Sequence, residues 1–319
     1  MFKNLIAYRY DDSKTDFNKI ASQIKNRNFL FKPLGDLDSH STGFDSFFDE
    51  TYIIEADNRI LLKIKFSSRT VSEQLVKNLL AERINEIKRE QKIDTVSDAV
   101  TEIYRQKIRL ETLKYTEPNV KNVFLLIDKY TKFIYVDASS PSLAEDSLHQ
   151  LRNVIGKLAC QHIRSASAGT RLSLFLCDPS NEEIGQISKN IHICDYPLLT
   201  ARNTDNTGSV TLDGINRRSS SYIEMLEGLY VKSVNMALRN GSEILATFTL
   251  LIGNKNIFIL KKFKYDVDEK TGIDPTTKID CVDDSSYYYT SKMLLIGRYM
   301  SLILSDFAEF FHLKTDEES

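Results

Sequence analysis

The chain has 319 residues, of which 42% are hydrophobic and 27% are charged, so it can bury a core and is not a disordered chain. Its 42 basic and 44 acidic residues give a formal net charge of -2. This balance excludes a uniformly basic nucleic-acid binder but leaves room for a local basic surface. The cysteines are widely scattered, which is typical of reduced thiols in a cytosolic protein; they are Cys160, Cys177, Cys194 and Cys281. The first residues are too polar for a signal peptide, and the apolar run 293–304 is too short to span a bilayer.

Helical and strand patterns alternate in clusters along the first third of the chain. The spacing predicts a strand over 5–10, a helix over 16–26 and a hairpin of strands 51–55 and 60–66. Two charged helices, 71–92 and 95–113, are expected to form a helical hairpin. Lys77 and Lys88 lie outside the apolar stripe of the first of them. Such a charged face is commonly solvated and laced with ion pairs, and an anionic partner is the alternative.

The remaining elements predict an α+β fold with antiparallel sheets and flanking helices, because regular βαβ alternation is missing. We expect a hairpin of strands 122–128 and 132–137, a helix over 142–156, and only short helices and loops over 165–221. Strands over 230–238, 243–252 and 256–266, an irregular loop, a final helix over 285–313 and a frayed tail over 314–319 follow. The predicted division is 1–68 with 120–164 as an N-terminal and central α+β region, 69–119 as the helical hairpin, and 165–319 as a C-terminal α+β region.

Sequence motifs for catalysis are missing. The chain has no phosphate loop, no G-x-G-x-x-G, no H-E-x-x-H and no G-x-S-x-G, and its five histidines are isolated. Asp11-Asp12 and Asp283-Asp284 lie where turns are expected, and aspartate favours turns for local reasons. We therefore predict a protein that is not an enzyme and has no cofactor or metal site. A metal-dependent nuclease is the minority alternative.

Two basic clusters are candidates for phosphate contact. On the strand over 256–266, Lys262 and Lys264 are expected on the face opposite Lys261 and Phe263. This row either binds an anionic partner or protects a solvated edge strand. Arg217 and Arg218 precede three serines in a predicted loop, and guanidinium and hydroxyl groups both donate to phosphate oxygens. Exposed arginine pairs are nevertheless common in loops.

Several colinear segments resemble one family of bacterial recombination-associated proteins, the RdgC family. The segments are Phe2-Lys3-Asn4-Leu5 with Tyr8-Arg9; 123–158, which includes Asp128, Val136-Asp137-Ala138, Ala144-Glu145-Asp146 and Leu151-Arg152; the helical hairpin; Leu260-Lys261-Lys262-Phe263-Lys264; and the C-terminal apolar helix. The resemblance implies a ring-forming homodimer that binds double-stranded DNA without sequence preference through a basic central hole. It also implies restraint of RecA-dependent homologous recombination by competition for DNA, a cytoplasmic and nucleoid-associated location, no membrane association and no catalysis.

The sequence departs from this family at two positions that matter. The family's basic stretch corresponds to 210–216, which lacks lysines here, so Arg217 and Arg218 are hypothesised to replace it. The nearest aromatic to the family's dimer contact is Tyr115. The expected DNA contacts are therefore Lys77, Lys88, Arg217, Arg218, Lys262 and Lys264. The alternative function is a protein-interaction module that acts directly on recombination proteins without binding DNA.

Overall fold

A computed structural model describes residues 2–26, 28–177, 187–203, 207–265 and 282–313. The chain forms two compact units. The first comprises Met1–Gln23, Ser46–Lys63 and Phe124–Ser319, and the second comprises Ile24–Asp45 and Ile64–Val123. The predicted α+β class with antiparallel sheets is confirmed. Across the described ranges, no helix combines the length and the apolar character needed to cross a bilayer. The three-part division of the sequence stays a prediction.

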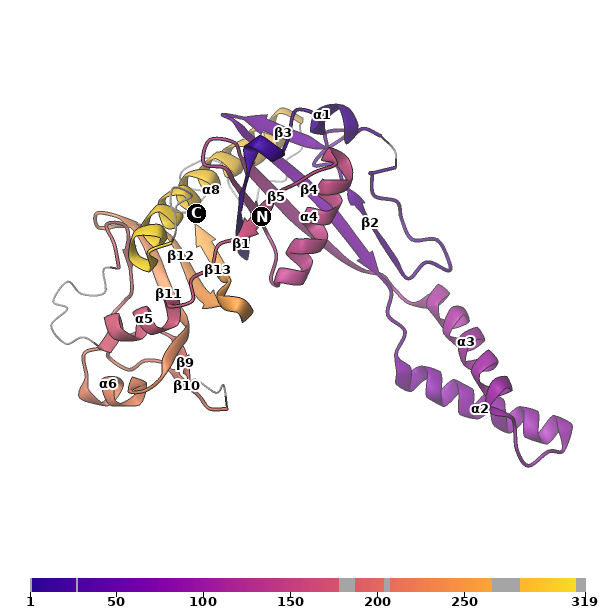
Figure 1. Ribbon diagram of the computed structural model, residues 1–319. Helices are drawn as coiled ribbons and strands as arrows, with labels where there is room; N and C mark the ends of the chain where they lie inside the picture. Colours follow the sequence, from indigo (N-terminus) through magenta and orange to yellow (C-terminus); the bar gives the residue numbers. More distant parts are fainter. Residues whose placement is uncertain (1, 27, 178–186, 204–206, 266–281, 314–319) are drawn as a thin grey trace. The chain divides into compact units, whose positions relative to one another are not determined.

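The first unit contributes most strands of a long antiparallel sheet, in which β11, β12 and β13 lie side by side (Figure 1). The predicted strands are confirmed, but β8, β9 and β10 fall in the region where only helices and loops were expected. Strands of two to four residues are too short to show a period-two pattern. Along the sheet, the strand order is β10 (Ser209–Leu212), β9 (Leu199–Arg202), β11 (Tyr230–Asn240), β12 (Glu243–Ile252), β13 (Phe258–Tyr265), β1 (Leu5–Tyr10), β6 (Phe133–Val136), β5 (Asn119–Asp128) and β4 (Arg59–Ser68). Three short strands pair outside this order: β3 (Ile53–Ala56) with β4, β7 (Cys160–His162) with β1, and β8 (Ile191–His192) with β11.

Helix α8 (Val282–Phe311) packs against this sheet and confirms the predicted final helix. The Phe307 ring meets Phe248 of β12 at 6.4 Å and Phe258 of β13 at 5.7 Å between centroids. All three rings are buried, so α8 closes the apolar face of the β12–β13 pair. Asp283 and Asp284 lie in the first turn of α8, not in the turn that the sequence suggested. The expected loop over 266–281 and the expected tail over 314–319 lie outside the described residues.

Local sequence signals account for the shorter helices of the first unit. Ser140 caps α4 (Pro141–Ile155) by accepting from the Leu143 amide, and Gly156 ends it with φ 83°. The remaining elements are α1 (Ile20–Gln23), α5 (Ala168–Cys177), α6 (Ser220–Leu226) and the 3-10 turns η1 (Asp12–Lys14) and η2 (Asn254–Asn256). α1 is shorter than the predicted 16–26 because Asp16 accepts from the Asn18 amide, and this local turn competes with helix.

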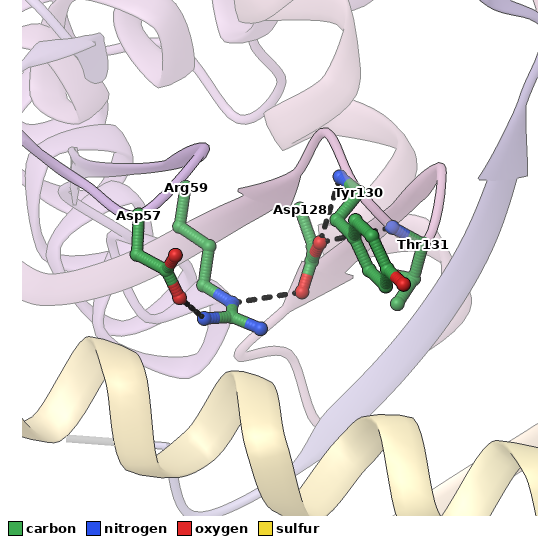
Figure 2. Close-up of polar contacts among 5 residues, drawn as sticks. All are labelled: Asp57, Arg59, Asp128, Tyr130 and Thr131. Carbon is green, nitrogen blue, oxygen red and sulfur yellow. Dashed lines mark hydrogen bonds and ion pairs between the residues drawn. The ribbon is translucent and has the colours of Figure 1, made fainter.

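A buried ion pair joins two hairpin turns of the first unit (Figure 2). Arg59, which opens β4, donates from Nε to Oδ2 of Asp128 at 2.8 Å and from a terminal nitrogen to Asp57 at 2.7 Å. The other Asp128 oxygen accepts from the amides of Tyr130 and Thr131, at 3.0 Å each. Asp128 therefore shapes the β5–β6 turn and holds it to the β3–β4 turn.

The second unit is dominated by a helical hairpin of α2 (Glu73–Gln91) and α3 (Asp98–Tyr115), as the sequence predicted (Figure 1). Ser72 and Ser97 cap the two helices, and Val76, Leu80 and Ile108 form the seam between them. Strand β2 (His40–Phe44) pairs with the second half of β4 and was not predicted. Gly43 of this strand lies against the backbone of Leu30 and Phe31, and an added Cβ would be 2.5 Å from the Phe31 nitrogen.

Candidate nucleic-acid interface

Two of the predicted DNA contacts, Lys77 and Lys88, come together on one groove of the helical hairpin. They are eleven positions apart on α2, which is about three helical turns, so they project from the same side. The groove has a volume of about 430 Å³, and no acidic side chain lines it. Its lining residues are Lys77, Leu80, Ala81, Ile84, Asn85, Lys88, Thr95, Val96 and Thr101.

Three arginines of the hairpin have acidic partners, unlike the cations of this groove. Arg83 pairs with Glu86 at 2.7 Å and Arg105 with Glu102 at 2.7 Å, and Arg109 pairs with Glu73 across the two helices. Within the described ranges, Lys77 and Lys88 form no ion pair. The two ammonium groups are therefore the charged groups of the groove lining. We call this groove the hairpin groove.

Strand β13 carries the second group of predicted contacts, and its geometry corrects one expectation. Thr247 pairs with Lys264 and Thr249 with Lys261, so two β13 residues, Lys262 and Phe263, oppose one residue of β12. This β-bulge, with φ 53° at Lys262, places Lys261 and Lys264 on the same face. The prediction that Lys261 shares the face of Phe263 was therefore wrong, because strict alternation does not survive the bulge.

The outward face of β11–β13 carries polar and basic side chains. Lys262 and Lys264 are exposed and Lys261 is half-buried, whereas Phe263 is buried. Thr249 donates from its hydroxyl to Asn235 Oδ1 at 2.7 Å on the neighbouring strand. Hydroxyl, amide and ammonium groups are the usual donors to DNA phosphates. The sequence missed Lys261, since only the register of β12 and β13 reveals its face.

The arginine pair divides into one buried and one exposed side chain. Arg217 is 4% exposed and lies 3.6 Å from Asp195, while Arg218 is exposed at 54% of its side chain and lies 3.7 Å from the same carboxylate. A buried guanidinium cannot meet a phosphate unless the loop opens. Arg218 remains accessible, but Asp195 offsets part of its charge.

Tyr115, the predicted dimer contact, is the last residue of α3 and is 88% exposed. Its ring is thus available to another molecule. Three further apolar side chains of the same helix, Val100, Ile103 and Leu110, are also exposed. Ile103 and Leu110 project from one side of α3, because they are seven positions apart, whereas Val100 lies in the same row as Tyr104 and the seam residue Ile108.

The acidic pair Asp11-Asp12, weighed as part of a nuclease site, has structural partners. Asp11 caps η1 and pairs with Lys14 at 2.8 Å, and Asp12 pairs with Lys132 at 3.0 Å. In the part of the chain that the structure describes, no three His, Cys, Asp or Glu side chains gather as metal ligands would. Cys160, Cys177 and Cys194 are free thiols, while Cys281 is outside the described residues.

Comparisons with known proteins agree with the resemblance in the sequence. Residues 1–184 match the family model described as "Putative exonuclease, RdgC". Relatives named "Recombination-associated protein RdgC" include those of Psychromonas ingrahamii and Tolumonas auensis, each 27% identical over 161 residues, and of Shewanella loihica, 26% identical over 161 residues. Each match covers 49% of this chain and 52% of the relative, so the chain spans about half the length of the curated relatives it matches. The family match covers more than half of the chain, and the chain therefore belongs to the RdgC family.

Proposed function

We propose that this protein binds double-stranded DNA without sequence preference and without cutting it, and thereby restrains RecA-dependent homologous recombination. The observation that carries the proposal is the hairpin groove, which Lys77 and Lys88 line and which has no acidic lining residue. Two unpaired ammonium groups on one groove suit the regular negative charge of a DNA backbone. Membership in a family whose relatives are named for recombination supplies the biological context.

The outward face of β13 supports the same function. Lys261, Lys262 and Lys264 lie among hydroxyl and amide groups that donate to phosphate oxygens. These contacts position a duplex but carry no base readout. An overall charge of -2 is compatible with this function, because binding depends on the local field and not on the net charge.

The proposal includes a ring-forming homodimer. Tyr115 supports it, since a tyrosine that is 88% exposed can add a large apolar contact at an interface. A ring would surround the duplex and let modest phosphate contacts act together. Competition with RecA for the same duplex then follows without any direct contact between the two proteins.

Fluorescence anisotropy of the full chain on labelled DNA tests the proposal. Two duplexes of unrelated sequence should bind with affinities equal within about threefold, and the matching single strand should bind less tightly. A strong preference for one duplex, or no duplex binding at physiological salt, would contradict the proposal of sequence-independent binding. Labelled duplex incubated with Mg²⁺ or Mn²⁺ should stay intact, and cleavage lost on substituting one acidic pair would establish a nuclease instead.

A second candidate function is direct binding to a recombination protein. The exposed apolar side chains of α3, Val100, Ile103 and Leu110, favour it, because apolar surface is typical of protein interfaces. In that case, the Ile103→Asp substitution should abolish binding to the partner while any duplex affinity stays unchanged. Loss of duplex binding on the same substitution would assign this face to the DNA-binding assembly.

A further inference from the structure

A cavity in the first unit has none of the residues assigned to duplex binding in its lining. It has a volume of about 950 Å³. Its walls come from β1, β6, β7, the segment 163–167 before α5, the turn η2 and the end of α8. These segments are far apart in the sequence, so no linear motif could have revealed the site.

The cavity is lined by cations and has no acidic lining residue. Arg9, Arg164 and Lys255 contribute permanent positive charges, and His162 and His312 contribute two titratable rings. Arg164 and Lys255 are exposed, and neither forms an ion pair with any described residue. Beside the cavity, a Glu145 oxygen lies 3.2 Å from His162 Nε2. The cavity is therefore suited to an anion.

Hydroxyl groups and apolar side chains complete the lining of the cavity. A small inorganic anion would make no use of the apolar side chains. Ser165 and Ser167 lie beside Arg164, with their hydroxyl oxygens 3.4 Å apart. Phe133, Leu304, Phe311 and Leu313 supply apolar surface in the same cavity, and Ser301 and Ser305 add hydroxyls from α8. A ligand that fits has a charged, hydrogen-bond-accepting end and a flat apolar body.

We propose that this cavity binds a nucleoside phosphate, with the phosphate among Arg164, Lys255 and the Ser165–Ser167 hydroxyls and the base against the apolar side chains. Guanidinium and ammonium groups form charge-assisted hydrogen bonds to phosphate oxygens, and the serine hydroxyls add donors. The volume of about 950 Å³ lies in the range of pockets for ligands of this size. The proposal goes beyond duplex binding and does not depend on it.

His162 offers an internal reporter for the bound anion. Burial lowers its pKa below the usual value, and the positive charges of Arg164 and Lys255 lower it further, while Glu145 raises it. A phosphate between these groups adds negative charge beside the ring and stabilises the imidazolium. Binding should therefore raise the His162 pKa, and a proton-detected titration of the histidine rings would measure this change.

Isothermal titration calorimetry of the full chain with adenosine monophosphate, adenosine and inorganic phosphate tests the site. Adenosine monophosphate should bind, and adenosine should bind at least about tenfold more weakly because it lacks the charge-assisted contacts. Inorganic phosphate should also bind more weakly, since it lacks the apolar contacts. Equal binding of adenosine and the monophosphate, or no binding of the monophosphate at millimolar concentration, would overturn the proposal.

The double substitution Arg164→Gln with Lys255→Gln should weaken binding of adenosine monophosphate about tenfold or more. Lys157→Gln is the matched control, because Lys157 is an exposed lysine of the same unit that does not line the cavity. Binding unchanged in the double variant would contradict the assignment. If the wild type binds no nucleotide and the double variant loses duplex binding, the cavity belongs to a DNA-binding surface. That result would also overturn the proposal of a nucleoside phosphate site.

Discussion

Arg59 donates from Nε to Asp128 Oδ2 at 2.8 Å, although the Asp128 side chain is fully buried and that of Arg59 is only 12% exposed. The pair joins the β3–β4 turn to the β5–β6 turn. Each carboxylate oxygen of Asp128 has a donor, which is the condition under which a buried charge is tolerated. The pair therefore holds together two hairpins that are distant in the sequence.

Removal of the Asp128 carboxylate should destabilise the first unit strongly. In Asp128→Ala, Arg59 keeps only its ion pair with Asp57, and the amides of Tyr130 and Thr131 lose their acceptor. We therefore expect the free energy of unfolding to fall by about 3–5 kcal/mol. Urea denaturation measures it. The matched control is Asp12→Ala, which removes an exposed pair with Lys132 and should cost below about 1 kcal/mol. Equal effects of the two substitutions would contradict the role of the buried pair.

A single methyl group at Gly297 should disturb the same ion pair from the side of α8. An added Cβ would lie 2.4 Å from Arg59 Nε, closer than any real contact. Gly297→Ala should therefore cost about 1–3 kcal/mol, despite the better helix propensity of alanine. Thermal denaturation would detect it, with Ser291→Ala on the same helix as the reference. An unchanged or increased melting temperature for Gly297→Ala would show that α8 does not press on Arg59.

Alkaline pH should weaken the fold through buried tyrosines. Burial raises the pKa of Tyr10 to about 12, and burial also raises the pKa values of Tyr8, Tyr135 and Tyr222. The folded state therefore keeps phenol protons that the unfolded state loses above a pH of about 10. By linkage, the stabilising contribution is complete below that pH and is lost as pH rises through the folded-state pKa.

Urea midpoints measured between neutral pH and strongly alkaline pH test this sign. The midpoint should stay level until a pH of about 10 and then fall. Tyr10→Phe should lessen the fall, because it removes one of the buried phenols. A midpoint that rises above pH 10 would mean that the tyrosines are ionised more easily in the folded state.

Tyr115 tests the proposed dimer. Tyr115→Ala should shift the mass measured by light scattering toward the monomer at low protein concentration, while the unfolding midpoint of the monomer changes little because the ring is exposed. Tyr130→Ala is the control, since it removes an equally exposed ring from the other unit. A dimer that persists in Tyr115→Ala, or a wild-type chain that is monomeric throughout, would contradict the contact.

Strong local signals allowed the sequence to predict much of the fold. Helix α4 has a serine cap, a proline in its first turn and a glycine at its end, and all three act within a few residues. The spacing of Lys77 and Lys88 likewise places them on one side of α2 before any packing is known. By contrast, the short strands β8 to β10 form only because β11 and its neighbours provide partners.

The parts of the candidate sites that depend on distant segments could not be predicted. The β-bulge at Lys262 follows from the register between β12 and β13, and alternation alone gave Lys261 the wrong face. The burial of Arg217 depends on Asp195 and its surroundings, which a paired-arginine pattern does not report. The cavity around Arg164 and Lys255 is assembled from strands, a turn and the end of α8, so only the fold brings its groups together.

The salt dependence of duplex binding tests the central claim most directly. For the wild-type chain, log affinity should fall linearly with log salt concentration, with a slope of about -0.9 per phosphate contact. The double substitution Lys77→Ala with Lys88→Ala should weaken duplex binding and reduce the slope by the equivalent of about two phosphate contacts. Lys107→Ala is the control, because Lys107 is an exposed lysine of α3 outside the hairpin groove, and it should leave the slope unchanged. An affinity independent of salt, or a slope unchanged in the double variant, would contradict phosphate binding by the hairpin groove.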